Sequence, residues 1–93
     1  MLVIIKSAPD TADASIGLTL AKEAGADLVL LQNGVYFAQR ERLGTFRGTV
    51  YVLNDDKRLR GIKDSEIDDR MKAVDYDRLT DLMTESDKVV GMF

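Results

Sequence analysis

Two short apolar runs, each ending abruptly in polar residues, constrain the fold of this chain more than any other feature. The first, Leu28–Gln32, leads into Asn33-Gly34, and the second, Thr49–Leu53, leads into Asn54 and two aspartates. Each run is followed by a segment with helical spacing. The first run does not alternate apolar with polar residues, which is typical of a parallel strand covered on both faces. The pattern predicts an α/β domain whose strand ends face a site.

The remaining segments continue this alternation of strand and helix. We expect strands over Leu2–Lys6, Leu28–Gln32, Thr49–Leu53, Lys72–Val74 and Lys88–Phe93. Four helices are expected, because Asn and Asp side chains cap helix N-termini. The first begins after Asp10, the second after Asn33, the third after Asp55 or Asp56, and the fourth after Asp75. Such alternation implies right-handed crossovers and a mainly parallel sheet with helices on both faces. We expect one domain over residues 1–93.

The first and last helices carry specific expectations. The helix after Asp10 is expected to bury Ala12, Ile16, Leu20, Ala21 and Ala24, and the helix after Asp75 to bury Leu79, Leu82 and Met83. Gly25 stands where a helix favours a left-handed residue at its end. Gly17 costs about 1 kcal/mol relative to Ala inside a helix, and a close approach of helix and sheet would explain it.

The segment that begins at Asn33 has two interpretations. Asn33-Gly34 between apolar runs is a strong hairpin signal. Alternatively, a helix begins there and ends at Gly44; Asn33 would cap it, and it would bury Val35, Ala38 and Leu43. We favour the helix, because residues 39–42 (Gln-Arg-Glu-Arg) would make a poor buried strand. The acidic segment Asp64–Arg70 is expected to be a loop or a helical turn.

Composition excludes several classes of function. The chain contains no Cys and no His, which removes thiolate nucleophiles, disulfides and the commonest general base. Neither glycine-rich phosphate-loop pattern occurs, so we expect no cofactor. A protein that binds the phosphates of nucleic acids usually has a basic face, whereas this chain has a net charge of −3. We therefore do not expect direct nucleic-acid binding. No apolar run approaches the roughly 20 residues of a membrane span, so we expect a cytoplasmic protein.

Polar residues at the strand ends are the candidates for a binding pocket. Ligands collect at the carboxyl ends of strands in open α/β sheets. These ends carry Gln32, Asn33, Gly34, Asn54 and Asp55. The alternative is that the Asn and Asp side chains serve only as helix caps, each worth about 1 kcal/mol. We predict no catalytic residue and no metal ligand.

Five apolar side chains are candidates for an interface with another subunit. Aromatic residues and Met are enriched in interfaces, and the candidates are Tyr36, Phe37, Phe46, Met92 and Phe93. Packing into the core of the chain itself is the alternative for each of them.

Several segments resemble the DsrH/TusB branch of the DsrE/DsrF/DsrH sulfur-relay superfamily. They are Leu28–Tyr36 (LVLLQNGVY), Val50–Asp56 (VYVLNDD), Arg60-Gly61-Ile62, Val74–Leu79 (VDYDRL) and Asp87–Phe93 (DKVVGMF). The similarity spans nearly the whole chain and keeps the order of the elements. It implies a three-layer α/β/α sandwich around a mainly parallel sheet of about five strands.

The resemblance also implies a role in sulfur relay. Relatives form oligomers, typically of related subunits, that pass persulfide sulfur between carrier proteins for 2-thiolation of the tRNA wobble uridine or for sulfur oxidation. In the sulfur-carrying paralogue, the reactive Cys ends the strand that precedes a segment like Arg58–Ile62. This place corresponds to Leu53 here, with Asn54 beside it, and neither side chain can form a persulfide.

Three hypotheses follow for the function. The first is a non-catalytic subunit that supports a Cys-bearing DsrE/DsrF-like (TusC/TusD-like) paralogue, with a persulfide carrier protein as a further partner, or a self-associating equivalent. The second is a small-molecule-binding or regulatory homo-oligomeric domain that uses the strand-end pocket. The third is an enzyme that uses Lys6, Ser7 or the carboxylates. Because a nucleophilic Ser needs a base within reach, we do not expect an enzyme.

Overall fold

The computed structural model describes residues 1–39 and 42–92. Its elements in chain order are β1 (Leu2–Ile5), α1 (Ala12–Ala24), β2 (Asp27–Leu30), η1 (Gln32–Ala38), β3 (Val50–Leu53), α2 (Asn54–Leu59), η2 (Asp64–Glu66), β4 (Met71–Val74), α3 (Tyr76–Glu85) and β5 (Val89–Met92). The elements η1 and η2 are 3-10 helices. All five expected strands are present, although Phe93 lies outside the described residues. None of the helices within the described ranges could cross a bilayer, given their length and polarity.

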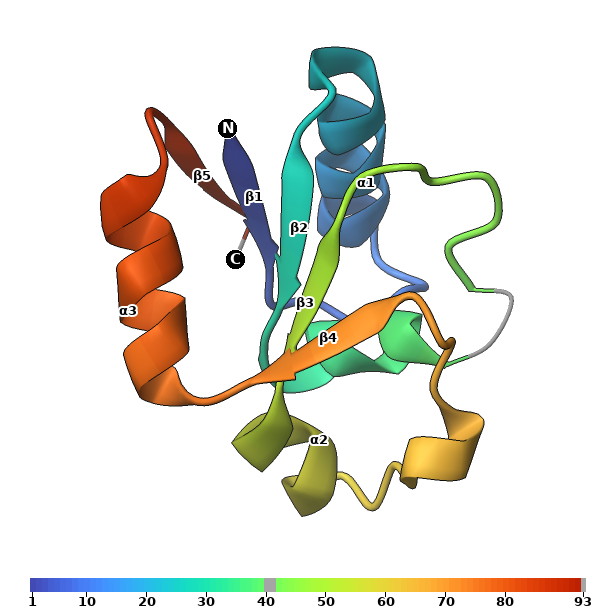
Figure 1. Ribbon diagram of the computed structural model, residues 1–93. Helices are drawn as coiled ribbons and strands as arrows, with labels where there is room; N and C mark the ends of the chain where they lie inside the picture. The colour runs from blue at the N-terminus through green and yellow to red at the C-terminus, as the bar shows by residue number, and fades with distance from the viewer. Residues whose placement is uncertain (40–41, 93) are drawn as a thin grey trace.

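The five strands form one sheet in the order β4-β3-β2-β1-β5. Every pair of neighbouring strands is parallel. Helices α1 and α3 lie on opposite sides of this sheet, and α2 lies beyond the end of β3 (Figure 1). The architecture is therefore the three-layer α/β/α sandwich with a parallel sheet that the sequence predicts.

Both faces of the sheet are buried at its central strands, β1, β2 and β3. Within β1, Val3 and Ile5 pack on the side of α1, whereas Leu2 and Ile4 pack on the side of α3. All four side chains are at most 4% exposed. Because neither face of the central strands meets water, these strands need no polar residues, and this explains their unbroken apolar runs in the sequence.

Helix α1 presents small residues to the sheet. The predicted stripe is confirmed at Ala21 and in part at Leu20, which is partly buried against the core. It was wrong at Ala12, Ile16 and Ala24, which are exposed. The buried residues are Ala14, Gly17 and Ala21, while Ile16 is 56% exposed. A Cβ atom at Gly17 would lie 2.8 Å from Cγ of Met92, so the close approach that Gly17 suggested is confirmed. A stripe of larger side chains would hold the helix farther from the sheet.

The ends of α1 confirm one expectation and correct another. Its N-terminal cap is Thr11 rather than Asp10, and the Thr11 hydroxyl accepts a hydrogen bond from the Ala14 N–H at 3.2 Å. Gly25 ends the helix in the left-handed conformation, with φ of 65°, as the sequence predicts. Thr11 has the short side-chain acceptor that an N-cap needs, so Asp10 is not required there.

The segment after β2 is helical, so the hairpin interpretation was wrong, but the helix is shorter than predicted. Element η1 ends at Ala38 instead of Gly44, and its cap is Leu31 instead of Asn33. Gln39 is extended and forms an antiparallel bridge with Ile67, which ends the helix. The predicted continuation crosses residues 40–41, which lie outside the described residues. Val35, Ala38 and Leu43 are buried, as the sequence predicts.

The two later helices also differ from the prediction in detail. Helix α2 begins directly after β3, so Asp55 and Asp56 lie in its first turn rather than at its cap, where they still favour the helix dipole. The Asp75 carboxylate caps α3 by accepting a hydrogen bond from the Arg78 N–H at 2.8 Å, as predicted. Leu79 and Leu82 are buried as predicted, but Met83 is 43% exposed, so the prediction was wrong there.

Candidate functional site

The carboxyl ends of β1, β2 and β3 lie at one edge of the sheet, next to η1 and α2 (Figure 1). The Leu31 N–H donates a hydrogen bond to the Ile5 carbonyl at 3.0 Å. The Gly34 N–H lies 3.2 Å from the Lys6 carbonyl and 2.8 Å from the Leu31 carbonyl. These hydrogen bonds hold the start of η1 against the end of β1.

Gly34 makes this close crossing possible. A Cβ atom at this position would lie 2.1 Å from the carbonyl oxygen of Ile5, far inside van der Waals contact. Because the obstacle is a backbone atom, no side-chain rotation can relieve the overlap. Gly34 therefore allows η1 to lie against the end of β1, because it has no side chain.

Asp56 stabilises the start of η1 from a distant part of the chain. Leu31, the residue at the cap position, has no side-chain acceptor, and Oδ2 of Asp56 accepts a hydrogen bond from the Gln32 N–H at 2.7 Å. The two residues are 24 positions apart in the sequence, and Asp56 is only 7% exposed. Gln32 has a φ of 48°, a left-handed conformation that non-glycine residues rarely adopt. The buried carboxylate thus holds a strained turn in place.

A second contact joins the same two elements. Oδ1 of Asn33 accepts a hydrogen bond from Nε of Arg60 at 3.0 Å, and Nη1 of Arg60 also donates to the backbone carbonyl of Asp56 at 3.4 Å. The structure thus links the predicted residues Gln32 and Asn33 to α2. Asn54 is partly buried at the start of α2, and Asp55 beside it is exposed.

Sequence reasoning proposed Asp55 for the pocket and missed the roles of Asp56 and Arg60. Asp56 and Arg60 are four residues apart, a spacing that places two side chains on one face of a helix. This spacing was the available signal, but it did not reveal that the partner of Asp56 is the distant backbone of Gln32.

We expect Asp56→Ala to lower the free energy of unfolding by about 1–3 kcal/mol, because it removes the buried carboxylate that accepts the hydrogen bond of the Gln32 N–H. The measurement is urea unfolding followed by circular dichroism. Asp55→Ala is the matched control, since the adjacent carboxylate is exposed and its loss should change stability by less than about 0.5 kcal/mol. Equal effects of the two substitutions would contradict this role for Asp56.

Leu53, which the resemblance predicts to stand at the place of the reactive Cys in sulfur-carrying paralogues, is buried at the end of β3. Leu53 is 1% exposed and belongs to the cluster of apolar side chains beneath α3. Asn54, next to it, is partly exposed. The end of β3 therefore carries the buried aliphatic side chain of Leu53 and the amide of Asn54, whereas persulfide chemistry requires a thiolate.

The profile of the family described as "DsrH like protein" matches residues 6–89. The chain belongs to the DsrH-like family. The crystal structure of the ychN protein from E. coli has a TM-score of 0.77 to the DsrH-like chain at 19% identity, and the match covers 97% of each chain. The solution structure of protein Tm0979 from Thermotoga maritima has a TM-score of 0.68 at 24% identity, covering 95% of this chain and 97% of that one.

These two structures show the shared fold, and the family supports a role in sulfur relay in general terms. The comparison with curated proteins finds no match.

Beside the strand-end site, a buried lysine of the DsrH-like chain is paired with a surface carboxylate. The Lys57 side chain is 6% exposed, and its ammonium group bonds to Oδ1 of Asp64, whose side chain is 90% exposed. The hydrogen bond and the positive charge of Lys57 lower the pKa of Asp64 below its ordinary value of 3.8. Asp87 has a pKa lowered in the same direction by the N-terminal ammonium of Met1, at 3.0 Å.

This pair predicts a dependence of stability on pH. Because the pKa of Asp64 is lower in the folded chain than in the unfolded chain, its contribution is present above about pH 4 and is lost as the pH falls further. Urea midpoints measured from about pH 6 to about pH 3 should therefore fall less for Asp64→Asn than for the unsubstituted chain. Parallel curves for the two proteins would contradict the pairing.

The interface candidates lie in three different environments. Phe37 and Phe46 are 4% and 2% exposed and belong to the core, so core packing describes them in this chain. Tyr36 and Met92 are partly buried and pack against the same core. Phe93 lies outside the described residues.

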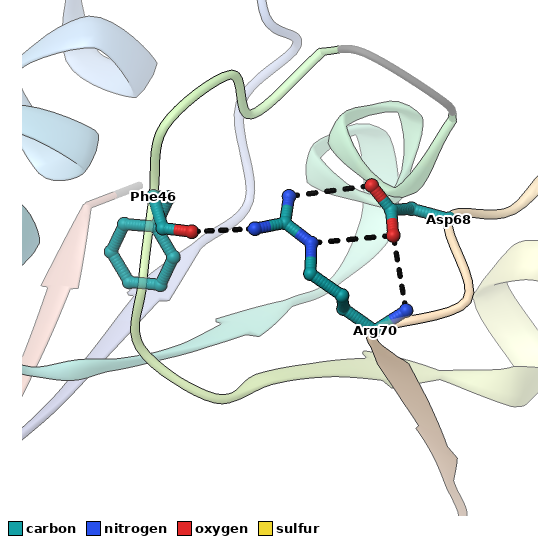
Figure 2. A network of polar contacts seen from close by, with 3 residues as sticks. All are labelled: Phe46, Asp68 and Arg70. Carbon is teal, nitrogen blue, oxygen red and sulfur yellow. Dashed lines mark hydrogen bonds and ion pairs between the residues drawn. The ribbon is translucent and has the colours of Figure 1, made fainter.

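A polar network holds the backbone at Phe46. Nη1 of Arg70 donates a hydrogen bond to the Phe46 carbonyl at 2.7 Å, while the same guanidinium group contacts both carboxylate oxygens of Asp68 at 3.3 Å (Figure 2). The Arg70 N–H also donates to Oδ1 of Asp68 at 3.0 Å. The network fixes the segment before β3 to the start of β4.

Proposed function

We propose that this DsrH-like chain is a non-catalytic subunit of a cytoplasmic sulfur-relay complex that supports a Cys-bearing paralogue. The observation that carries the proposal is the end of β3, where Leu53 is buried and Asn54 follows it, in a chain without any Cys. Persulfide transfer needs a thiolate that attacks and accepts sulfur. A partner with a Cys at the corresponding place would supply that group.

The strand-end contacts suit a supporting role. The hydrogen bond that Asp56 accepts from Gln32 and the one that Arg60 donates to Asn33 fix η1 and α2 relative to each other, which gives a partner subunit a rigid surface. Oδ1 of Asn33 and Oδ2 of Asp56 already accept hydrogen bonds within the chain, so these two atoms are less suited to a small ligand. We therefore favour the supporting subunit over a ligand-binding domain at this site.

The partners in this proposal are Cys-bearing DsrE/DsrF-like (TusC/TusD-like) paralogues, together with a persulfide carrier protein. The sulfur would be destined for tRNA wobble-uridine 2-thiolation or for sulfur oxidation. The family membership supports a role in sulfur relay in general, and these two destinations are what the resemblance implies.

Transfer of radiolabelled sulfur tests the non-catalytic role. A donor protein that carries a labelled persulfide is incubated with the chain, and covalent label is read on a non-reducing gel. We expect no label on the chain, and we expect reductant-sensitive label on Asn54→Cys, which places a thiol at the partly exposed strand end. Covalent label on the unsubstituted chain would overturn the proposal.

A second measurement tests the supporting role itself. Sulfur transfer from the labelled donor to a Cys-bearing DsrE-like partner is followed with and without the DsrH-like chain. We expect faster transfer when the chain is present. An unchanged rate over a range of chain concentrations that exceeds the partner concentration would contradict this role.

A further inference from the structure

The Asn33-Gly34 pair combines a reactive sequence with a restrained conformation. In an Asn-Gly sequence the backbone nitrogen of Gly can attack the side-chain carbonyl carbon of Asn, because Gly has no side chain to obstruct the approach. Asn33 is exposed, so water reaches its amide group. The pair lies in η1 directly after Gln32, whose φ of 48° marks a strained backbone. Whether the pair reacts therefore depends on the conformation of η1.

The attacking nitrogen is restrained by β1. The Gly34 N–H donates to the Lys6 carbonyl at 3.2 Å and to the Leu31 carbonyl at 2.8 Å. To close a succinimide ring with Asn33, this nitrogen must lose its proton, and the backbone between the two residues must rotate. A Cβ atom at Gly34 would lie 2.1 Å from the Ile5 carbonyl oxygen, so the backbone there is packed closely against β1. Ring closure therefore requires η1 to move away from β1.

The amide that would be attacked is restrained by α2 and the residue that follows it. Oδ1 of Asn33 accepts a hydrogen bond from Nε of Arg60 at 3.0 Å, which fixes the orientation of the amide group. Oδ2 of Asp56 accepts a hydrogen bond from the Gln32 N–H at 2.7 Å, which holds the turn on which η1 begins. Both contacts must be released before the side chain and the backbone of the pair can meet.

We propose that Asn33-Gly34 is a site of spontaneous deamidation that is closed in the folded chain and reacts when η1 opens. The Gly34 nitrogen forms a bond to Cγ of Asn33 and releases its proton to water. The bond from Cγ to Nδ2 breaks, and ammonia leaves with a proton taken from water. Water then opens the succinimide at either carbonyl, which gives Asp or isoaspartate. The inference is independent of the sulfur-relay proposal, because it concerns only the chemistry of this pair.

The two products differ in their effect on the fold. Asp at this position keeps the original backbone and an oxygen atom that can accept the hydrogen bond of Arg60. Isoaspartate routes the backbone through the former side chain and adds a methylene group to it just before Gly34, where the contact with Ile5 is already close. We therefore expect the isoaspartyl product to lose the contact between η1 and β1.

Peptide mass spectrometry of the full chain, incubated at a fixed, mildly alkaline pH, measures the rate of deamidation at Asn33. Chromatography of the peptides separates Asp from isoaspartate. We expect the folded chain to react at least about tenfold more slowly than the same chain in guanidinium chloride, because only the opened segment reacts. Equal rates in the folded and unfolded chain, or no reaction in the unfolded chain, would overturn the proposal.

Substitutions in and directly after α2 test which contacts keep the site closed. Arg60→Met should raise the rate in the folded chain by roughly two- to tenfold, as expected for the loss of one hydrogen bond. Arg58→Met is the matched control, since Arg58 is exposed in α2 and carries the same charge. Asp56→Ala should also raise the rate, and Asp55→Ala should leave it unchanged.

Circular dichroism shows whether each of these variants is folded. An unchanged or slower reaction in either Arg60→Met or Asp56→Ala would overturn the proposal, since the contact removed would then not restrain the pair. Acceleration of the same size in a test variant and its matched control would overturn it as well.

Discussion

Gly34→Ala should lower the free energy of unfolding by at least about 3 kcal/mol. This is the largest loss that we expect from a substitution that adds a methyl group and removes no contact. The added Cβ would lie 2.1 Å from the Ile5 carbonyl oxygen, so η1 or β1 must move. Helix propensity alone predicts the opposite sign, because Ala is favoured over Gly by about 1 kcal/mol inside a helix. A loss of stability would therefore indicate that η1 crosses the end of β1 in close contact, and a gain would indicate that helix propensity dominates.

Urea unfolding at a fixed protein concentration measures this effect, and Gly44→Ala provides a control. Gly44 has a φ of 58°, but a Cβ there would meet no atom within 4 Å. Its substitution should cost only the backbone strain of a left-handed Ala, about 1–2 kcal/mol. Stability of Gly34→Ala equal to or above that of Gly44→Ala would contradict the close contact.

Phe46→Ala should lower the free energy of unfolding by about 3–5 kcal/mol, as expected for a fully buried aromatic side chain. Phe46 is 2% exposed and packs with the α1-side core. Its removal would leave a void that the neighbouring segment cannot fill easily, because Arg70 fixes the backbone there. The same urea titration measures the loss.

Arg47→Ala is the matched control for Phe46→Ala. Arg47 is the next residue along the chain and is exposed, so its truncation should change stability by less than about 0.5 kcal/mol. A loss below about 1 kcal/mol for Phe46→Ala would contradict the core assignment and would favour the interface role that the sequence also allowed.

The strands and their parallel arrangement could be predicted from the sequence because burial on both faces leaves a strong signal. Runs such as Leu28–Leu30 contain apolar residues without interruption, which is uncommon in strands that face water on one side. The Asp75 cap and the Gly25 helix end were predictable for a similar reason, since each depends on a neighbouring part of the chain.

The buried face of α1 could not be predicted in the same way. Hydrophobic spacing favoured Ile16 and Leu20, but the distance between helix and sheet decides which face fits, and that distance follows from Gly17 against Met92 at the far end of the chain. The role of Asp56 was hidden for the same reason, because its hydrogen-bond partner lies 24 residues away.

The contacts among the predicted strand-end residues could not be predicted. Gln32 and Asn33 form hydrogen bonds with Asp56 and Arg60, whereas the Asp55 side chain is exposed. Two adjacent aspartates look alike in the sequence. Because α2 begins directly after Leu53, Asp56 is the aspartate that is buried and Asp55 is the one that is exposed.

The central claim is that this DsrH-like chain supports a partner that carries the sulfur. Affinity isolation of the tagged chain from its native cells, followed by mass spectrometry with quantified stoichiometry, tests that claim most directly. We expect a Cys-bearing DsrE-like protein in a fixed ratio to the chain. Recovery of the chain alone as a defined homo-oligomer would contradict the claim.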